Sequence, residues 1–132
     1  MVRKLPSFMI HFTMACTVLI VDDHPGYRAA ARTVLEADGF DVVGEAATGL
    51  EGVSEAARLR PQIVLLDIGL PDIDGVEVAQ RITAAAGGNA PVVVLISSRD
   101  GDGCEAVFAA CGARGFIPKA ELSGDAITAL AA

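Results

Sequence analysis

Two runs of consecutive apolar residues most constrain how this chain can fold. Ile63-Val64-Leu65-Leu66 and Val92-Val93-Val94-Leu95-Ile96 contain no polar residue, so neither has the apolar and polar alternation of a strand with one face in water. Both faces of these strands must therefore be covered. A parallel sheet between two layers of helices meets this requirement, and the sequence predicts an α/β sandwich.

The rest of the chain alternates short strand patterns with longer helical patterns. Strands are predicted over Thr17 to Asp22, Asp41 to Glu45, Gln62 to Ile68, Pro91 to Ser97 and Gly115 to Pro118. Helices are predicted over Pro25 to Ala37, Leu50 to Arg60, Val76 to Ala86, Glu105 to Ala110 and Glu121 to Leu130. This order gives five β-α units. A central strand needs the backbone donor that Pro118 lacks, so the last strand is predicted at an edge of the sheet.

Composition limits the class of protein. A chain of 132 residues that is 52% hydrophobic has room for one compact domain with a sizeable core. Its formal net charge of −7 opposes binding to nucleic-acid phosphates and to anionic membrane surfaces. The three cysteines lack the spacing of a disulfide framework or a zinc site, so a reducing cytoplasm is the expected location.

The amino-terminal residues resemble a secretory signal only superficially. Arg3 and Lys4 precede a largely apolar stretch, but this stretch contains His11 and Thr13, and its second half is needed as the first strand. Residues 1–14 are therefore predicted to be a flexible extension, and residues 15–132 the folded domain. No other segment approaches the length of a membrane span.

Polar side chains gather where the predicted strands end. Ligands of open parallel sheets bind outside the carboxyl ends of the strands, and those ends carry Asp22 and Asp23, Asp67, Ser97 and Lys119. Three carboxylates in one partly desolvated cleft would oppose one another's ionisation. A divalent cation removes this conflict, and oxygen ligands with open water positions suit Mg²⁺. With Mg²⁺ and Lys119 neutralising the transferring oxygens, a carboxylate can accept a phosphoryl group.

Each of these residues could also have a purely structural role. An acidic pair after a strand often only caps the next helix, Ser97 could simply end its strand, and a single lysine such as Lys119 is commonly a solvated surface residue. Asp67 is harder to explain in this way, because it directly follows a buried strand. The shared placement of all these residues at strand ends favours a functional site.

The same segments resemble the response-regulator receiver domain of two-component signalling. V-L-I-V-D-D-H-P, I-V-L-L-D-I-G-L-P-D-I-D-G, V-V-V-L-I-S-S and G-A-R-G-F-I-P-K match the family pattern in order and spacing over residues 17–131. The V-D-D-H-P variant is most similar to the NarL/FixJ group. The resemblance implies a flavodoxin-like, doubly wound (βα)5 sandwich with strand order 2-1-3-4-5.

The resemblance also implies a role for each site residue. Asp67 would be the phosphoacceptor, and Asp22, Asp23, Asp67 and the backbone carbonyl of Gly69 would hold Mg²⁺. Lys119 would bind the phosphoryl oxygens, Ser97 would be the switch hydroxyl, and Phe116 would be the switch aromatic. The partner would be a sensor histidine kinase, and a homodimer is plausible by analogy. No enzymatic activity is expected beyond self-phosphorylation from a donor and slow hydrolysis.

Some positions differ from common receiver usage, and other functions stay open. Ser98 stands where Ala or Gly is usual, and Ala120 follows the active lysine where many relatives have proline. Gly69 and Arg99 occupy positions that tune dephosphorylation, and they leave the phosphoryl lifetime open. One alternative is a pseudo-receiver that is not phosphorylated and acts through protein contacts. A flavin-binding electron carrier is disfavoured, because D-D-H-P-G-Y-R puts two negative charges where a phosphate loop would be needed.

Overall fold

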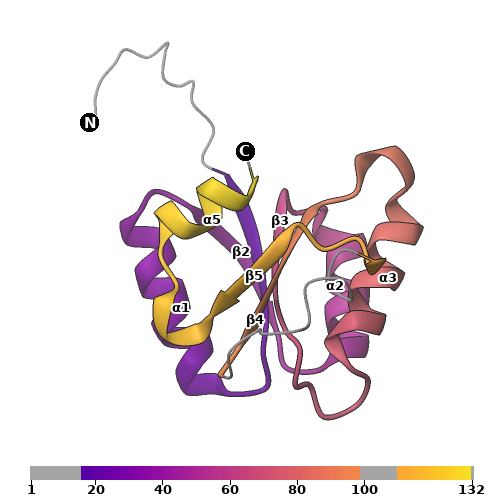
Figure 1. Ribbon diagram of the computed structural model, residues 1–132, viewed down its shortest axis with the longest axis horizontal. Coiled ribbons are helices and arrows are strands. Elements are labelled where there is room, and N and C mark those ends of the chain that lie inside the picture. Colours follow the sequence, from indigo (N-terminus) through magenta and orange to yellow (C-terminus); the bar gives the residue numbers. More distant parts are fainter. Residues whose placement is uncertain (1–15, 99–109, 132) are drawn as a thin grey trace.

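A single parallel sheet organises the protein. The computed structural model describes residues 16–98 and 110–131. Its five strands lie in the order β2-β1-β3-β4-β5 (Figure 1). Their bounds are β1 Thr17–Val21, β2 Asp41–Ala46, β3 Ile63–Asp67, β4 Val92–Ser97 and β5 Gly115–Pro118. The predicted flavodoxin-like order 2-1-3-4-5 is confirmed, and Pro118 lies on an edge strand as its missing donor requires.

Helices cover both faces of this sheet. Their bounds are α1 Pro25–Ala37, α2 Gly49–Leu59, α3 Gly75–Ala86 and α5 Gly124–Ala131. Helices α1 and α5 lie on one face, and α2 and α3 lie on the other (Figure 1). Of the helix predicted over Glu105 to Ala110, all but Ala110 lies outside the described residues.

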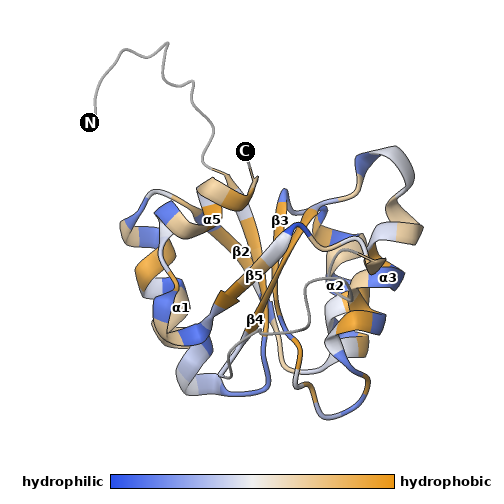
Figure 2. Cartoon of the chain, viewed as in Figure 1, coloured by the Kyte–Doolittle hydropathy of each residue, from blue (hydrophilic) through white to orange (hydrophobic). Residues whose placement is uncertain are grey.

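The core forms two apolar layers because successive strand residues point to opposite faces. In β1, Val18 and Ile20 pack in the cluster with α1 and α5, while Leu19 and Val21 pack in the cluster with α2 and α3. All four side chains are fully buried. Figure 2 shows apolar residues along the strands between the helical layers. This double burial is the reason why the strand sequences lack polar alternation.

The last helix begins later than the sequence suggested. It starts at Gly124 instead of Glu121, because residues Lys119–Glu121 form a short 3-10 turn, η2. Two side chains bond the amides of the first helical turn. Asp38 Oδ2 accepts a hydrogen bond from the Gly124 amide (2.7 Å), and Ser123 Oγ accepts one from the Ala126 amide (3.0 Å). These contacts fix the helix start at Gly124.

The predicted extension of residues 1–14 lies outside the described residues. Within the described ranges, no helix has the length and apolar character needed to cross a membrane.

Candidate functional site

The carboxyl ends of four strands bring the predicted site residues to one rim of the sheet. Asp22 directly follows β1, and its amide continues the ladder by donating to the Ala46 carbonyl (3.0 Å). Asp67 is the last residue of β3, and Ser97 is the last residue of β4. Lys119 follows the end of β5. The parallel topology therefore places these groups at the same edge, as the sequence predicted.

Acidic groups form a compact cluster at this rim. One ligand atom from each of Asp22, Asp23, His24 and Asp67 lies within 4.8 Å of the others. The Asp22 side chain is fully buried, and Asp67 is 4% exposed. Carboxylates this close and this poorly hydrated repel one another, so the cluster requires nearby positive charge.

Lys119 supplies part of that charge. Its Nζ lies 2.6 Å from Asp22 Oδ2 and donates a hydrogen bond to Asp67 Oδ2 at 3.3 Å. The lysine side chain is only 13% exposed, so these contacts are less screened than a surface ion pair. One ammonium cannot neutralise three carboxylates, and the cluster keeps a net negative charge.

Two carboxylate oxygens of the cluster are suited to binding a divalent cation. Asp22 Oδ2 and Asp23 Oδ1 are buried without a hydrogen bond of good geometry to any of the described residues. Each nevertheless has a nitrogen close by, Lys119 Nζ for Asp22 and His24 Nδ1 at 3.1 Å for Asp23. The Lys119 ammonium neutralises part of the charge at Asp22, and neither contact is a hydrogen bond that satisfies the oxygen lone pairs. Adjacent hard oxygen donors of this kind are the ligands that Mg²⁺ prefers.

Backbone amides orient the two buried carboxylates. The Gly69 amide donates to Asp67 Oδ1 (3.0 Å), and the His24 amide donates to Asp22 Oδ1 (2.8 Å). Arg28 Nη1 also donates to the Asp22 carbonyl (2.7 Å). Asp67 is thus held on one oxygen by Gly69 and on the other by Lys119. The sequence predicts that the Gly69 carbonyl is a Mg²⁺ ligand. In the structure, the contact of Gly69 at this site is the hydrogen bond from its amide to Asp67 Oδ1.

Ser97 and Phe116 lie on the neighbouring strands β4 and β5. Ser97 is 7% exposed and pairs in register with Pro118, the residue before Lys119. Phe116 is partly buried and packs against the core cluster on the α2 and α3 face. The next residue, Ile117, points into the opposite cluster. The predicted switch hydroxyl, on Ser97, therefore lies across the β4-β5 pair from the residue before Lys119. The predicted switch aromatic, Phe116, is three residues before Lys119 in the chain.

Two residues of this site were missed as functional candidates from the sequence. His24 was not singled out, yet its Nδ1 contacts the carboxylates of both Asp22 (3.2 Å) and Asp23 (3.1 Å). Tyr27 was not singled out, yet its ring centroid lies 4.7 Å from Lys119 Nζ. A signal was available, since His24 directly follows the acidic pair as the N-cap of α1, and Tyr27 is the third residue of that helix.

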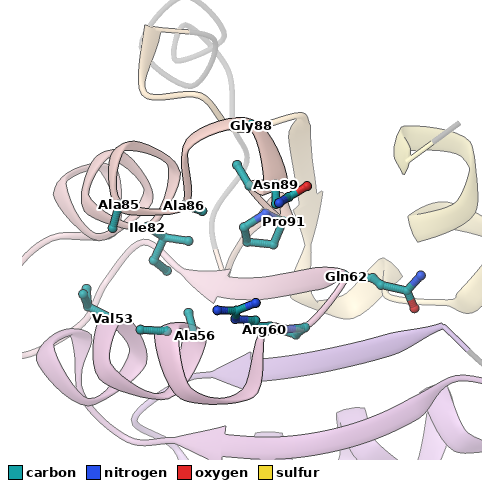
Figure 3. A pocket seen from close by; sticks show the side chains of 13 residues that line it. Val53, Ala56, Arg60, Gln62, Ile82, Ala85, Ala86, Gly88, Asn89 and Pro91 are labelled. Atoms are coloured by element: carbon teal, nitrogen blue, oxygen red, sulfur yellow. The ribbon is translucent and has the colours of Figure 1, made fainter.

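A separate hollow lies at the other end of the sheet. It has a volume of about 750 Å³ and is bounded by the carboxyl ends of α2 and α3, where Figure 3 shows Ala56, Ile82 and Ala85 on its walls and Arg60 beside it. Gln62 and Pro91 place it at the amino ends of β3 and β4. It therefore contains none of the acidic residues and is distinct from the site at the rim.

Comparison with known proteins identifies the family. A family model described as the response regulator receiver domain matches residues 18–131, which is nearly the whole chain. The chain belongs to the response-regulator receiver family. The resemblance predicted from the sequence motifs is confirmed, and the protein is a receiver domain of two-component signalling.

The chain spans about half or less of the length of the curated relatives that it matches. A transcriptional regulator of Pseudomonas aeruginosa is 43% identical over 108 residues, which cover 79% of this chain and 49% of that protein. A protein-glutamate methylesterase/protein-glutamine glutaminase of Alkalilimnicola ehrlichii is 37% identical over 117 residues, which cover 85% of this chain and 29% of that protein. The receiver domain thus spans about half of one relative and less than a third of the other.

Solved structures agree with this assignment. A two-component response regulator of the LuxR family from Aurantimonas sp. SI85-9A1 has a TM-score of 0.80 at 28% identity, covering 89% of this chain and 86% of that chain. The receiver domain of the NarL response regulator of Mycobacterium tuberculosis has a TM-score of 0.75 at 28% identity, covering 88% and 96%. The predicted similarity to the NarL/FixJ group agrees with these neighbours.

Proposed function

We propose that this receiver domain accepts a phosphoryl group on Asp67 in a Mg²⁺-dependent reaction and changes conformation in response. Receiver domains are phosphorylated by histidine kinases, so a sensor histidine kinase is the proposed donor. The observation that carries the proposal is the position of the Lys119 ammonium, 3.3 Å from Asp67 Oδ2 and beside the cluster of carboxylate oxygens.

Mg²⁺ would be held by the carboxylates of Asp22, Asp23 and Asp67 together with the Gly69 carbonyl. When bound, it supplies positive charge to the oxygens of the phosphoryl group during transfer. The two carboxylate oxygens that lack hydrogen bonds, on Asp22 and Asp23, support this assignment. His24, whose Nδ1 contacts Asp23 Oδ1, would have to yield this oxygen to the cation, and Lys119 Nζ would have to share Asp22 Oδ2 with it.

The chain's own groups would perform the transfer. An oxygen of the Asp67 carboxylate attacks phosphorus while the bond from phosphorus to the donor's imidazole nitrogen breaks. The Gly69 amide, which contacts Asp67 Oδ1, holds the nucleophile in place. The Lys119 ammonium, already at the second oxygen, pairs with the phosphoryl oxygens as their charge develops.

The response would pass through Ser97 and Phe116. The Ser97 hydroxyl, at the buried end of β4, would move to bond a phosphoryl oxygen, and Phe116 would turn inward as it moves. A ligand can shift such an equilibrium only through contacts that differ between the two states, and these two side chains provide them. The responding surface would include β5 and α5, and it could mediate homodimerisation as in related receivers.

The proposed role is that of a switch in the cytoplasm. We propose no catalytic activity beyond self-phosphorylation and slow hydrolysis of the phosphoryl group. The net charge of −7 argues against nucleic-acid contact by this chain itself. The three cysteines of the chain lack the spacing of a disulfide framework or a zinc site, which is consistent with a reducing compartment.

Labelling with radioactive acetyl phosphate tests the proposal. Wild-type protein should incorporate phosphate with Mg²⁺ and not with a chelator, and Asp67→Asn should incorporate none. Asp41→Asn is the matched control, because Asp41 is an exposed aspartate on β2, and it should label like wild type. Labelling of Asp67→Asn to the wild-type level would reject the site. Failure of the wild type to take up phosphate or to bind Mg²⁺ would favour the pseudo-receiver alternative.

A further inference from the structure

Tyr27 contacts both ends of Lys119. It is the third residue of α1 and packs against the core cluster on the α1 and α5 face. The chain contains no other tyrosine and no tryptophan. Tyr27 and Lys119 are 92 positions apart in the sequence, so only the fold brings them together.

The first contact is between the tyrosine ring and the ammonium. Lys119 Nζ lies 4.7 Å from the ring centroid, within the roughly 6 Å range in which a cation is attracted to an aromatic face. The same ammonium contacts the carboxylates of Asp22 and Asp67. The aromatic ring therefore adds an uncharged contact to the two carboxylate contacts of the lysine head group.

The second contact anchors the lysine backbone. Tyr27 Oη donates a hydrogen bond to the Lys119 carbonyl oxygen at 3.3 Å. This carbonyl lies where β5 ends and the short turn η2 begins. A lysine side chain has a flexible four-carbon stem, so holding both its backbone and its ammonium restricts where the charge can be.

The tyrosine hydroxyl keeps its proton over the working pH range of the protein. Burial raises the pKa of Tyr27 to about 12, and the negative charges of Asp22 and Asp67 add to the increase. Tyr27 is therefore a hydrogen-bond donor at neutral pH and adds no negative charge to the acidic cluster.

We propose that Tyr27 is a positioning residue that holds the Lys119 ammonium where it meets the incoming phosphoryl group. The assignment rests on the proposed phosphotransfer function and deepens it. A charge fixed in advance needs little reorganisation when negative charge develops on the phosphoryl oxygens. Without the ring and the hydroxyl, the ammonium spends more time in positions that do not contact those oxygens.

Two variants separate the contributions of the ring and the hydroxyl. Tyr27→Phe keeps the aromatic face and loses the hydrogen bond, whereas Tyr27→Leu loses both. At saturating Mg²⁺ and fixed acetyl phosphate, Tyr27→Leu should label at a rate roughly 3- to 30-fold below wild type, the range of a cation–π contact expressed as a rate. The labelling rate of Tyr27→Phe should lie between those of the wild type and Tyr27→Leu. Val34→Ala, a truncation of an exposed side chain on the same helix, should label like wild type.

The possible outcomes distinguish the two proposals. Absence of labelling in the wild type overturns the phosphotransfer function itself. Labelling of the wild type with an equal rate for Tyr27→Leu overturns only the role of Tyr27. A defect in Tyr27→Leu that disappears as Mg²⁺ approaches saturation also overturns it, because the tyrosine would then act on metal affinity.

A spectroscopic measurement is independent of phosphorylation and of the folding of the Tyr27 variants. Because Tyr27 is the sole tyrosine and no tryptophan is present, the intrinsic fluorescence of the protein reports this one ring. Lys119→Met removes the ammonium from the ring face, and the emission intensity should change. Emission equal to that of the wild type would show that the ring does not contact the ammonium in solution, and the proposal would be rejected.

Discussion

Lys119 Nζ lies 2.6 Å from Oδ2 of Asp22, closer than to Oδ2 of Asp67 at 3.3 Å. Asp22 is also a proposed Mg²⁺ ligand, so the ammonium and the metal share a carboxylate. Two cations at one buried carboxylate repel each other. The lysine should therefore weaken metal binding while it assists phosphoryl transfer.

Replacement of Lys119 by methionine should separate these two effects. We expect Lys119→Met to bind Mg²⁺ more tightly, by up to roughly tenfold, because a like charge next to the metal is removed. Its labelling by acetyl phosphate should fall by about 10²- to 10³-fold, as for loss of one preorganised group that stabilises the transition state. Isothermal titration and phosphate incorporation measure the two quantities. Weaker Mg²⁺ binding in this variant would contradict the charge argument.

Mg²⁺ should stabilise the folded protein. A cation that binds only the folded state at ten times its dissociation constant adds about 1.4 kcal/mol to the free energy of unfolding. Thermal unfolding followed by circular dichroism should therefore shift to higher temperature with Mg²⁺, compared with NaCl at equal ionic strength. In Asp23→Asn the shift should shrink, because the variant loses a carboxylate of the proposed metal site. An equal shift in both proteins would exclude Asp23 as a ligand.

Gly75 should tolerate no side chain. A Cβ at this position would lie 2.6 Å from the Ile68 Cα and 2.8 Å from the Asp67 carbonyl oxygen, and both are backbone atoms. Gly75→Ala should lower the free energy of unfolding by about 1–3 kcal/mol, the usual effect of overpacking. It should also slow labelling, since the backbone of Asp67 must move.

Gly26→Ala is the matched control for Gly75→Ala. No atom of the described residues lies within 4 Å of a Cβ at Gly26, which is also helical, so alanine should stabilise the protein by about 0.5 kcal/mol. Urea unfolding measures both variants. Equal stability of Gly75→Ala and wild type would show that the loop after Asp67 adjusts freely.

Asp72 should contribute stability that depends on pH. Its carboxylate accepts hydrogen bonds from the Leu50 and Gly49 amides at the start of α2, and these bonds lower the pKa of Asp72 below its ordinary value of 3.8. Because the pKa of Asp72 is lowered in the folded state, the contribution of its carboxylate to the free energy of unfolding is fully present above pH 3.8. It is lost as the pH falls through the lower folded-state pKa.

Comparison of wild type with Asp72→Asn tests this dependence. The wild type should be more stable at neutral pH, and the difference should decrease as the pH falls below about 4. Urea unfolding at a series of pH values measures it. A difference that stays constant into the acid range would mean that the charge of Asp72 contributes nothing.

Local sequence patterns predicted the framework of this fold accurately. The bounds of α1 are those predicted, Pro25 to Ala37, and Gly39 follows its end with a φ of +92° that glycine adopts without strain. The apolar runs identified β3 and β4 to within one residue at each end. Hydrophobic periodicity and the backbone preferences of proline and glycine act over a few residues, so they can be read without knowing the tertiary structure.

The sequence by itself determined the sandwich, the edge position of Pro118 and the acids at the strand ends, because each depends on neighbouring residues alone. Only the tertiary structure decided that Lys119 lies nearest to Asp22, that Tyr27 covers its ammonium, and that Asp72 caps a helix 22 to 23 residues earlier in the chain. These partners are selected by the distances between packed elements. No local pattern encodes such distances, since they result from the whole core coming together.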